Sequence, residues 1–437
     1  MPGCTTADIA DSSWHGTQTA GLIGAATNNG IGMASVGRDI RVLPLRVLGK
    51  CGGYDSDIQD AMRWAAGIAV AGVPANPNPA KVINLSLGSP VTPAIPSCPQ
   101  SYQDVVNEVT AAGVLVVAAA GNDGLAVGTP ANCAGVVAVA GLRHSGTKVG
   151  YSDLGPEVAI AAPAGNCVTV SGTCQFPLLT TANSGTAGPV SSIYTDGGSN
   201  ASIGTSFSAP LVAGTAALML SANRTLTPAQ LIAALKASAR PFPTSGAAPI
   251  QRVMGGPFVP VSACQAPTST AQDYECYCTT STCGAGMLDA SAAVAAVAKL
   301  TANVYAPATS TVGSAIGVDG TGSVATGSSP IVTYQWAISG GSGTAAFTSA
   351  TNASTATLVA SAAGTVTLSL TVTDSANKSD TTSATLSVTD VPVAPPATGG
   401  GGGGGAFDPL WLAGVLLAAF VLSRSRRSST SRSSRSR

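Results

Sequence analysis

Short, nearly continuous runs of small and branched apolar residues constrain the fold of the first 300 residues more than any other feature. The runs are Asp39–Leu48, Lys81–Leu87, Val114–Ala120, Val136–Ala140 and Val158–Ala161. A strand that is apolar without alternation is buried on both faces, as in a parallel sheet covered by helices. We therefore predict that these runs are the strands of a buried parallel sheet.

Segments with helical periodicity separate these runs or follow them. They are Ser56–Ala71, Tyr102–Ala112, Thr205–Ser221, Pro228–Ala239 and Gly286–Lys299. Alternation of strands and helices is typical of α/β proteins. We predict an α/β domain over residues 1–300, in which residues 241–283 are loops.

Composition limits the function classes that remain. The chain has 437 residues, enough for two or three domains, and 45% of them are hydrophobic, which suffices for a large core. Charged residues make up 9% and the formal net charge is zero. Nucleic-acid binding depends on concentrated positive charge, so no nucleic-acid partner is predicted.

All ten cysteines fall within the first 283 residues. An even number of dispersed cysteines predicts up to five disulfides and an oxidising compartment, although the sequence does not assign their pairing. The alternative is a metal knuckle at Cys276, Cys278 and Cys283. With only two histidines in the chain, zinc ligation is the less favoured reading.

Composition changes sharply after residue 300, to Thr, Ser, Val, Ala and Gly. Val366, Leu368, Leu370 and Val372 alternate with polar residues, and turn residues recur between such runs. This pattern predicts a small antiparallel β-sandwich over residues 301–391, with Trp336 as its core aromatic residue.

The end of the chain has the pattern of a tethered membrane segment. A Pro/Gly-rich linker at 392–405 precedes an apolar stretch at 406–422 and an arginine-rich tail at 423–437. Seventeen helical residues rise about 25 Å, near the lower limit for a bilayer span, and the arginines predict a cytoplasmic tail. A buried core helix is the alternative, but the polyglycine tether and the arginines disfavour it.

Ser206 lies in the sequence Gly-Thr-Ser-Phe-Ser-Ala-Pro, directly before a helical run. A serine at a helix N-terminus faces outward, where the helix dipole stabilises negative charge. Ser206 is therefore a candidate nucleophile. The alternative is that Thr205 or Ser206 caps an ordinary helix.

Two further segments carry candidate catalytic groups. His15 precedes a Gly/Ala-rich helical segment whose tight packing would hold a general base rigidly, whereas His144 lies in a polar loop and has no predicted role. Asn122 follows a buried strand, at the edge where α/β sheets bind ligands. A simple Asn-Asp-Gly turn is its alternative interpretation.

Together these segments resemble the subtilisin-like serine peptidases, the subtilases, over roughly residues 4–298. The motifs HGTQTAG, NLSLGS, AAAGN and GTSFSAPLVAG occur in the family's order. The resemblance implies that Ser206 attacks a peptide carbonyl, that His15 transfers its proton, and that the Asn122 side chain and the Ser206 N–H form the oxyanion hole. It implies a subtilisin-like sheet and chemistry without a cofactor, and it is compatible with a structural calcium ion whose ligands the sequence does not assign.

The resemblance also implies the residues that line the substrate cleft. An extended peptide would add as a strand between two edges and be read mainly through its backbone. No residue on these edges is charged, so we expect an apolar or broad preference. The predicted lining residues are Gly52, Gly53, Ser86, Leu87, Gly88, Ala120 and Gly121.

The chain departs from the family pattern at the catalytic aspartate. Subtilases carry it in an Asp-(Ser/Thr)-Gly motif after a strand, well before the histidine. Here only Asp8 and Asp11 precede His15, and neither has that context. The family's second histidine is replaced by Gln18, which we do not expect to touch the chemistry. Residues 1–14 also lack the pattern of a signal peptide.

Two explanations remain open for the missing aspartate. The first is truncation, in which a signal peptide, propeptide, first strand and aspartate lie upstream and the present chain is nearly inactive. The second is a true loss that leaves a catalytically dead pseudopeptidase with the cleft as a binding surface. A separate alternative function is a surface adhesin that binds protein substrates and whose active part is the Ig-like domain.

The resemblances of the C-terminal region imply an exported protein. The tail resembles a Gly-Gly sorting signal of Gram-negative bacteria, which implies transient membrane anchoring, cleavage by a rhomboid-like sorting protease and release to the surface or medium. The sandwich resembles PKD or other Ig-like repeats, for which a spacer role is expected. Polypeptides are the expected substrates.

Overall fold

The computed structural model describes residue 5 and residues 11–92, 97–167, 174–175, 177–195, 202–251, 256–325 and 329–392. The chain divides into a unit at residues 1–389 and a second at residues 390–437. The predicted linker and membrane segment at 406–422 lie outside the described residues.

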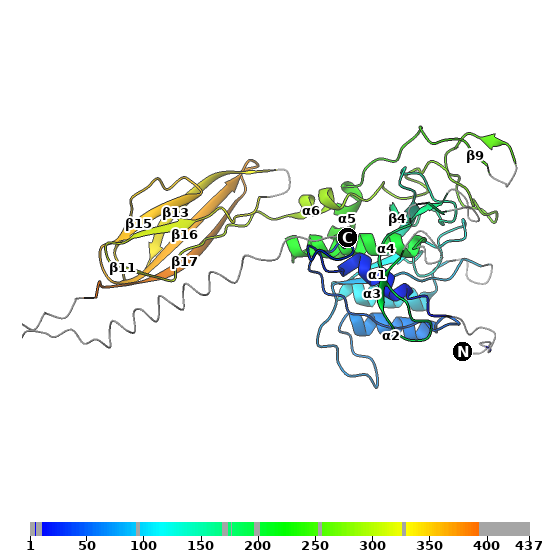
Figure 1. The fold of residues 1–437 in the computed structure, drawn as a ribbon, viewed down its shortest axis with the longest axis horizontal. Helices are drawn as coiled ribbons and strands as arrows, with labels where there is room; N and C mark the ends of the chain where they lie inside the picture. The colour runs from blue at the N-terminus through cyan, green and yellow to red at the C-terminus, as the bar shows by residue number, and fades with distance from the viewer. Residues whose placement is uncertain are drawn as a thin grey trace, which may run out of the picture. The chain divides into compact units, whose positions relative to one another are not determined.

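A four-stranded parallel sheet forms the centre of the first part of the chain (Figure 1). Its order is β1-β2-β3-β4, and every neighbouring pair is parallel. The strands are β1 (Val82–Leu85), β2 (Leu115–Ala119), β3 (Val136–Leu142) and β4 (Val158–Pro163). All residues of β2 and β3 are buried, which confirms the prediction of a parallel sheet covered on both faces.

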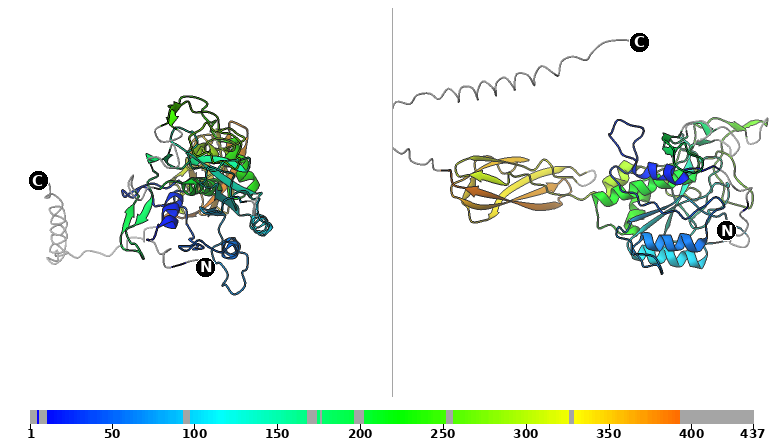
Figure 2. Two further views of the ribbon diagram at one scale, coloured as in Figure 1. Left: turned by 90° about the vertical axis from the view of Figure 1, so that its right-hand side faces the viewer. Right: turned by 60° about the horizontal axis from the view of Figure 1, so that its bottom comes forward.

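Helices cover both faces of this sheet. Val116 and Ala118 of β2 pack in one core with two helices, and Leu115 and Val117 pack in another core with three. Successive strand residues point to opposite faces, so one strand contributes to both cores. The helices of the first core are α2 (Asp55–Ala65) and α3 (Gln100–Ala111), which are drawn side by side in Figure 2. The helices of the second core are α4 (Thr205–Ala222), α5 (Pro228–Ala237) and α6 (Ala290–Val297).

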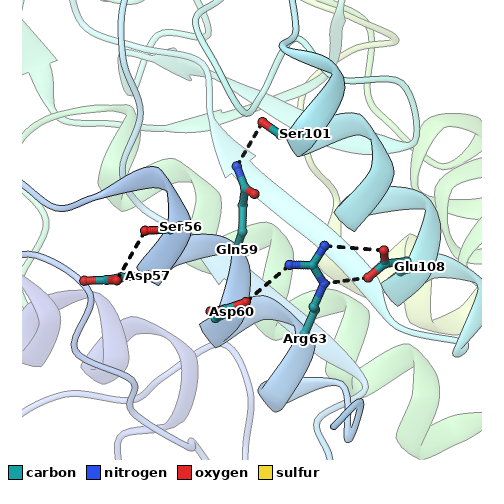
Figure 3. A network of polar contacts seen from close by, with 7 residues as sticks. All are labelled: Ser56, Asp57, Gln59, Asp60, Arg63, Ser101 and Glu108. Atoms are coloured by element: carbon teal, nitrogen blue, oxygen red, sulfur yellow. Dashed lines mark hydrogen bonds and ion pairs between the residues drawn. The ribbon is translucent and has the colours of Figure 1, made fainter. Parts of the chain in front are cut away.

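Polar contacts join α2 and α3 (Figure 3). The guanidinium of Arg63 contacts both carboxylate oxygens of Glu108, at 2.6 and 3.4 Å, and also Asp60 at 3.3 Å. These carboxylates raise the pKa of Arg63 above its usual value. Gln59 donates to the hydroxyl of Ser101 at 3.2 Å. The contacts set how the two helices lie against each other while their apolar faces meet the sheet.

The predicted strand at Asp39–Leu48 is wrong. Residues 40–48 form no strand, and Val42, Leu43, Leu45 and Leu48 are 38–39% exposed. A strand exists only where a neighbour completes its hydrogen bonds, and none of the described residues pairs with this segment. Pro44 also lacks the N–H that a central strand must donate.

The sheet edge formed by β1 is unpaired as well. β1 is the end strand, and among the described residues no strand pairs with its outer edge. The buried Oδ1 of Asn84 on β1 has no hydrogen-bond partner there, although its Nδ2 donates to Ser86 Oγ at 2.9 Å. Both β1 and the extended segment 41–48 thus have unpaired backbone within the described part of the chain.

Three helices are shorter than predicted, α5 by its last two residues and the other two by more. α2 ends at Ala65 rather than Ala71, because Gly67 adopts a φ of 81° that interrupts a right-handed helix. α6 begins at Ala290 rather than Gly286, because Asp289 accepts from the Ala292 N–H at 2.9 Å and caps the helix.

Disulfides join loops around the α/β part. Those described are Cys98–Cys133, Cys264–Cys276 and Cys278–Cys283, and Cys51 is also disulfide-bonded. The alternative of a metal knuckle at Cys276, Cys278 and Cys283 is therefore wrong. Short hairpins complete this part: β5 (Asn166–Cys167) with β6 (Cys174–Gln175), β7 (Thr181–Asn183) with β8 (Ser192–Tyr194), and β9 (Ile250–Gln251) with β10 (Phe258–Val259).

The chain after α6 forms two packed sheets. One has the order β11-β17-β16-β13 and the other β12-β15-β14. Trp336 is 2% exposed, and the alternating residues Val366–Val372 on β16 face the core, as predicted. One pair departs from the prediction, since β11 is parallel to β17. The strands are β11 (Thr309–Thr311), β12 (Ala315–Asp319), β13 (Ile331–Gly340), β14 (Ala345–Phe347), β15 (Thr355–Ala360), β16 (Gly364–Asp374) and β17 (Ser379–Thr389).

Among the described residues, only α4 has the length and apolar character of a membrane span. Two thirds of it, 67%, is buried inside the protein. Its position against the sheet identifies it as a core helix.

Candidate active site

Ser206 is the second residue of α4 and lies half-buried at the N-terminal end of that helix. Gly204 precedes the helix with a φ of 134°, a conformation that favours glycine. Thr205 and Phe207 on either side are buried. The local sequence thus presents one hydroxyl at the positive end of a buried helix dipole.

The backbone around Ser206 is tied to the end of β1. Pro210 has no N–H, so the carbonyl of Ser206 loses its normal partner four residues ahead in the helix. Ser86 supplies the missing donor, since its hydroxyl donates to Ser206 O at 2.6 Å. In return, Ser206 Oγ donates to Ser86 O at 3.4 Å. Ser86 therefore fixes the turn that carries the candidate nucleophile.

Asn122 lies beside the N-terminus of α4, where Thr205 orients its side-chain amide. Its Oδ1 accepts from the Thr205 N–H at 2.9 Å and from the Thr205 hydroxyl at 3.1 Å. The Thr205 hydroxyl also donates to Gly121 O at 3.1 Å. The N-cap residue of α4 is Gly204, and no side chain of the helix caps it, so the alternative that Thr205 or Ser206 is an ordinary N-cap does not hold. Asn122 is exposed, and no described hydrogen bond uses its Nδ2, so this end of the amide is suited to donate to an anion near Ser206.

His15 is the first residue of α1 (His15–Gly24). Its ring lies edge-on to that of Phe207, with centroids 5.5 Å apart. Trp14 before it has a φ of 53°, and the Trp14 indole donates to Gly185 O at 2.6 Å. Burial lowers the pKa of His15, which favours the neutral form that a general base requires.

Close packing against β7 holds α1 in place. Thr180 donates to Gln18 O at 2.6 Å and Thr181 donates to Thr17 O at 2.9 Å. A side chain at Gly21 would overlap the hydroxyls of both threonines. The Gln18 side chain donates to Ser13 O at 3.2 Å, and no described contact joins it to His15 or Ser206.

No carboxylate pairs with the His15 imidazole in the described part of the chain. Asp11 is exposed, and its described contact is through its backbone carbonyl, which accepts from Lys50. Asp8 lies outside the described residues. The structure therefore brings together the predicted base, nucleophile and oxyanion donor without a group that orients the base.

The predicted substrate-lining residues divide into two groups. Ser86 and Gly121 contact residues 205–206 directly, and Leu87 and Ala120 pack into the core beside them. The other group comprises Gly52, Gly53 and Gly88. Gly52 and Gly53 close a turn against Gly49 and Val47, and Gly88 lies against Thr129; no described contact joins these three glycines to Ser206.

Sequence reasoning missed Asp153. This residue is 1% exposed, and its Oδ1 accepts from the backbone N–H groups of Asp123 and Leu125, each at 2.9 Å. Desolvation raises the pKa of Asp153 to about 6, although these N–H groups oppose the shift. The sequence signal that could have identified Asp153 is that it is the one charged residue in the stretch 149–154.

The described residues contain one cluster of three potential metal-ligating side chains. It comprises Cys264, Cys278 and Cys283, all in disulfides. Calcium prefers oxygen ligands, so this cluster does not fit a calcium ion.

Comparison with known proteins supports the subtilisin-like prediction for the first part of the chain and the PKD-like prediction for the sandwich. The model of the subtilase family matches residues 3–258, and a model of a PKD domain matches residues 311–388. An extracellular protease of Xanthomonas campestris pv. campestris is 44% identical over 237 residues, which cover 54% of this chain and 37% of that protein. An extracellular basic protease of Dichelobacter nodosus is 43% identical over 226 residues, which cover 50% and 34%.

A solved structure is similar as well. A protease from Pseudoalteromonas arctica PAMC 21717 is 39% identical, with a TM-score of 0.52, over 66% of this chain and 72% of that one. The matched residues span little more than a third of the two curated relatives.

Proposed function

Because the chain belongs to the subtilase family, we propose that it is a serine endopeptidase that hydrolyses peptide bonds of extracellular proteins. One observation carries this proposal. Segments far apart in sequence converge on the N-terminus of α4: the ring of His15 meets Phe207, the amide of Asn122 bonds to Thr205, and Ser86 bonds to Ser206.

In the proposed mechanism, Ser206 Oγ attacks the peptide carbonyl while His15 accepts its proton. The tetrahedral oxyanion receives hydrogen bonds from Asn122 Nδ2 and the Ser206 N–H. His15 then donates the proton to the leaving amine, and an acyl-enzyme remains on Ser206. Water then attacks that ester while His15 accepts its proton, and His15 returns the proton to Ser206 Oγ as the carboxylic acid product leaves. No step requires a cofactor, and a calcium ion would have a structural role only.

We propose further that a carboxylate outside the described residues orients His15. One feature supports it: no described strand pairs with the outer edge of β1. A strand added at this edge would pair with the backbone groups of β1 there. In a subtilisin, loss of the triad aspartate lowers kcat about 3 × 10⁴-fold. We therefore expect very low activity from any form in which no carboxylate orients His15.

Substrate binding would follow the two edges next to Ser206. The residues near it, Ser86, Leu87, Ala120 and Gly121, are uncharged, which supports an apolar or broad preference. An extended peptide bound there is held mainly by backbone hydrogen bonds. A bulky apolar side chain before the scissile bond is the first substrate to test.

We propose that the protein is exported. Two similar proteins are named extracellular proteases, and disulfides are stable in oxidising compartments. On the same proposal, the tail at 406–437 anchors the chain transiently and a rhomboid-like protease removes it. The β-sandwich serves as a spacer.

A second function is favoured by the lack of a described carboxylate at His15. If no such group exists in the full protein, the cleft binds polypeptides without cutting them, as a pseudopeptidase or surface adhesin. Hydrolysis of a peptide substrate would support the peptidase, whereas binding of the peptide without hydrolysis would support this second function.

A fluorophosphonate probe, which labels an activated serine covalently, tests the proposal. We expect labelling of a form extended upstream to include an aspartate-bearing strand, and much slower labelling of the present chain. Ser206→Ala should abolish labelling, and Ser221→Ala, an exposed serine on the same helix, should leave it unchanged. A folded extended form that never labels would refute the peptidase and favour the binding protein.

A further inference from the structure

The turn that carries Asn122 is fixed from beneath by one buried side chain. Asp153 Oδ1 accepts from the N–H groups on both sides of Gly124, those of Asp123 and Leu125. The Asp153 backbone N–H donates to Gly121 O at 3.1 Å. A methyl group at Gly121 would collide with this carboxylate, so carboxylate and turn are in direct contact.

A buried lysine backs this arrangement. Lys148 is fully buried, and its ammonium donates to Val149 O, Gly150 O and Gln272 O at 2.8–2.9 Å. These bonds join the stretch that carries Asp153 to a segment more than a hundred residues away. Burial lowers the pKa of Lys148 to about 7, against the attraction of Asp153 and Asp273.

That distant segment is a disulfide-bonded loop, and it covers the same turn from outside. Gln272 N–H donates to Gly124 O at 2.7 Å, and Gly124 has a φ of 66°. The Gln272 side chain bonds twice to the backbone of Gln265, at 2.9 Å each, and Cys264–Cys276 closes the loop. The loop lies beyond residues 3–258, which the subtilase model matches.

We propose that Asp153 is a positioning residue for Asn122 and that the Cys264–Cys276 loop clamps the same turn. The proposal rests on the proposed peptidase function. An oxyanion donor works only if it is held in place before charge develops. Thr205 orients the Asn122 amide itself, while Asp153 and Gln272 hold the backbone from which it projects.

A double-mutant cycle on the labelling-competent extended form tests the role of Asp153. Asn122→Ala should lower the maximal labelling rate about 10²–10³-fold. Asp153→Ala should lower that rate at least about tenfold with little change in the probe's half-saturation concentration. In the Asn122→Ala background, Asp153→Ala should have no further effect, because the two act through one donor. Equal losses in both backgrounds would refute the proposal.

A conservative variant separates positioning from folding. Asp153→Asn keeps an acceptor oxygen and should restore most of the rate that Asp153→Ala loses. Asp123→Ala, on the exposed face of the same turn, is the matched control and should label normally. An Asp153→Asn variant that folds yet labels as slowly as Asp153→Ala would count against the role.

Hydrogen exchange of the present chain provides a test that needs no activity. Cys264→Ser with Cys276→Ser should deprotect the amides of residues 121–125, whereas Cys98→Ser with Cys133→Ser should not. Unchanged protection at 121–125 would overturn the clamp. A failure of every form to label, with the expected loss of protection, would refute the peptidase function and leave the clamp standing.

Discussion

At the scale of single residues, the site depends on a few side chains that compensate for backbone irregularities. Pro210 leaves the Ser206 carbonyl without its helical partner, and Ser86 replaces that partner. Gly204 adopts a conformation that places Thr205 against Asn122. Each irregularity brings a functional atom close to another segment of the chain.

Ser86→Ala tests the first compensation. The variant leaves the half-buried Ser206 O without its described donor, which costs up to about 1–3 kcal/mol and allows the serine turn to shift. We expect at least a roughly tenfold slower fluorophosphonate labelling of the extended form. Ser89→Ala, an exposed serine three residues on, should label at the parent rate. Parent-like labelling of Ser86→Ala would show that the Ser206 turn holds without it.

Asp153 predicts a specific dependence of stability on pH. Its folded pKa, about 6, lies above the unfolded 3.8, so the folded state binds the proton more tightly than the unfolded state. The contribution of Asp153 is therefore complete below pH 3.8 and is lost as pH rises through 6, by about 1–3 kcal/mol. Lys148 and Asp123 are the charged groups that act on it.

Thermal unfolding of the parent and of Asp153→Asn between pH 3.5 and 7.5 measures this. The stability of the parent relative to the variant should fall between pH 3.8 and 6. Near pH 7 the titration of Lys148, whose pKa Asp153 raises, adds a further dependence on pH. Titration of His15 cancels in the comparison. A difference independent of pH would mean that Asp153 has an ordinary pKa.

At the scale of elements, the position of α1 depends on Gly21, which has no side chain to separate the helix from its neighbours. Gly21 lets the helix approach Thr180 and Thr181 closely enough for both hydroxyls to bond to its carbonyls. His15 at the start of the same helix then meets Phe207 at the start of α4. A change in the depth of α1 therefore changes the distance between His15 and Ser206, the proposed base and nucleophile.

Gly21→Ala should show this effect. The added methyl group overlaps the two threonine hydroxyls, and we expect a loss of about 1–3 kcal/mol in unfolding free energy together with slower labelling. Gly16→Ala is the matched control, since nothing lies within 4 Å of its new methyl group. It should be neutral or stabilise by up to about 1 kcal/mol. Equal stability of the two variants would refute the packing argument.

At the scale of the whole molecule, the fold was predictable wherever its causes are local. Continuous apolar runs predicted β1 to β4, and strict alternation predicted β16 around Trp336. The run at Asp39–Leu48 failed because strand formation depends on a neighbour, which no local pattern records. The motifs also predicted that His15, Asn122 and Ser206 belong to one site; the structure places all three near the N-terminus of α4, and their catalytic roles stay predictions. Asp153 was missed because its bonds reach back about 30 residues to another turn.

The outer edge of β1, which no described strand covers, and the apolar segment 41–48 also bear on the storage of this protein at high concentration. An exposed edge with apolar neighbours is a template for pairing with another chain. We expect light scattering to rise with protein concentration. Leu45→Lys should reduce that rise without changing the unfolding temperature, whereas Lys299→Arg, on the segment after α6, should not. Scattering that is independent of both concentration and Leu45 would mean that the edge is protected in solution. If the expectation holds, the shelf life of the purified protein is set at this one sheet edge.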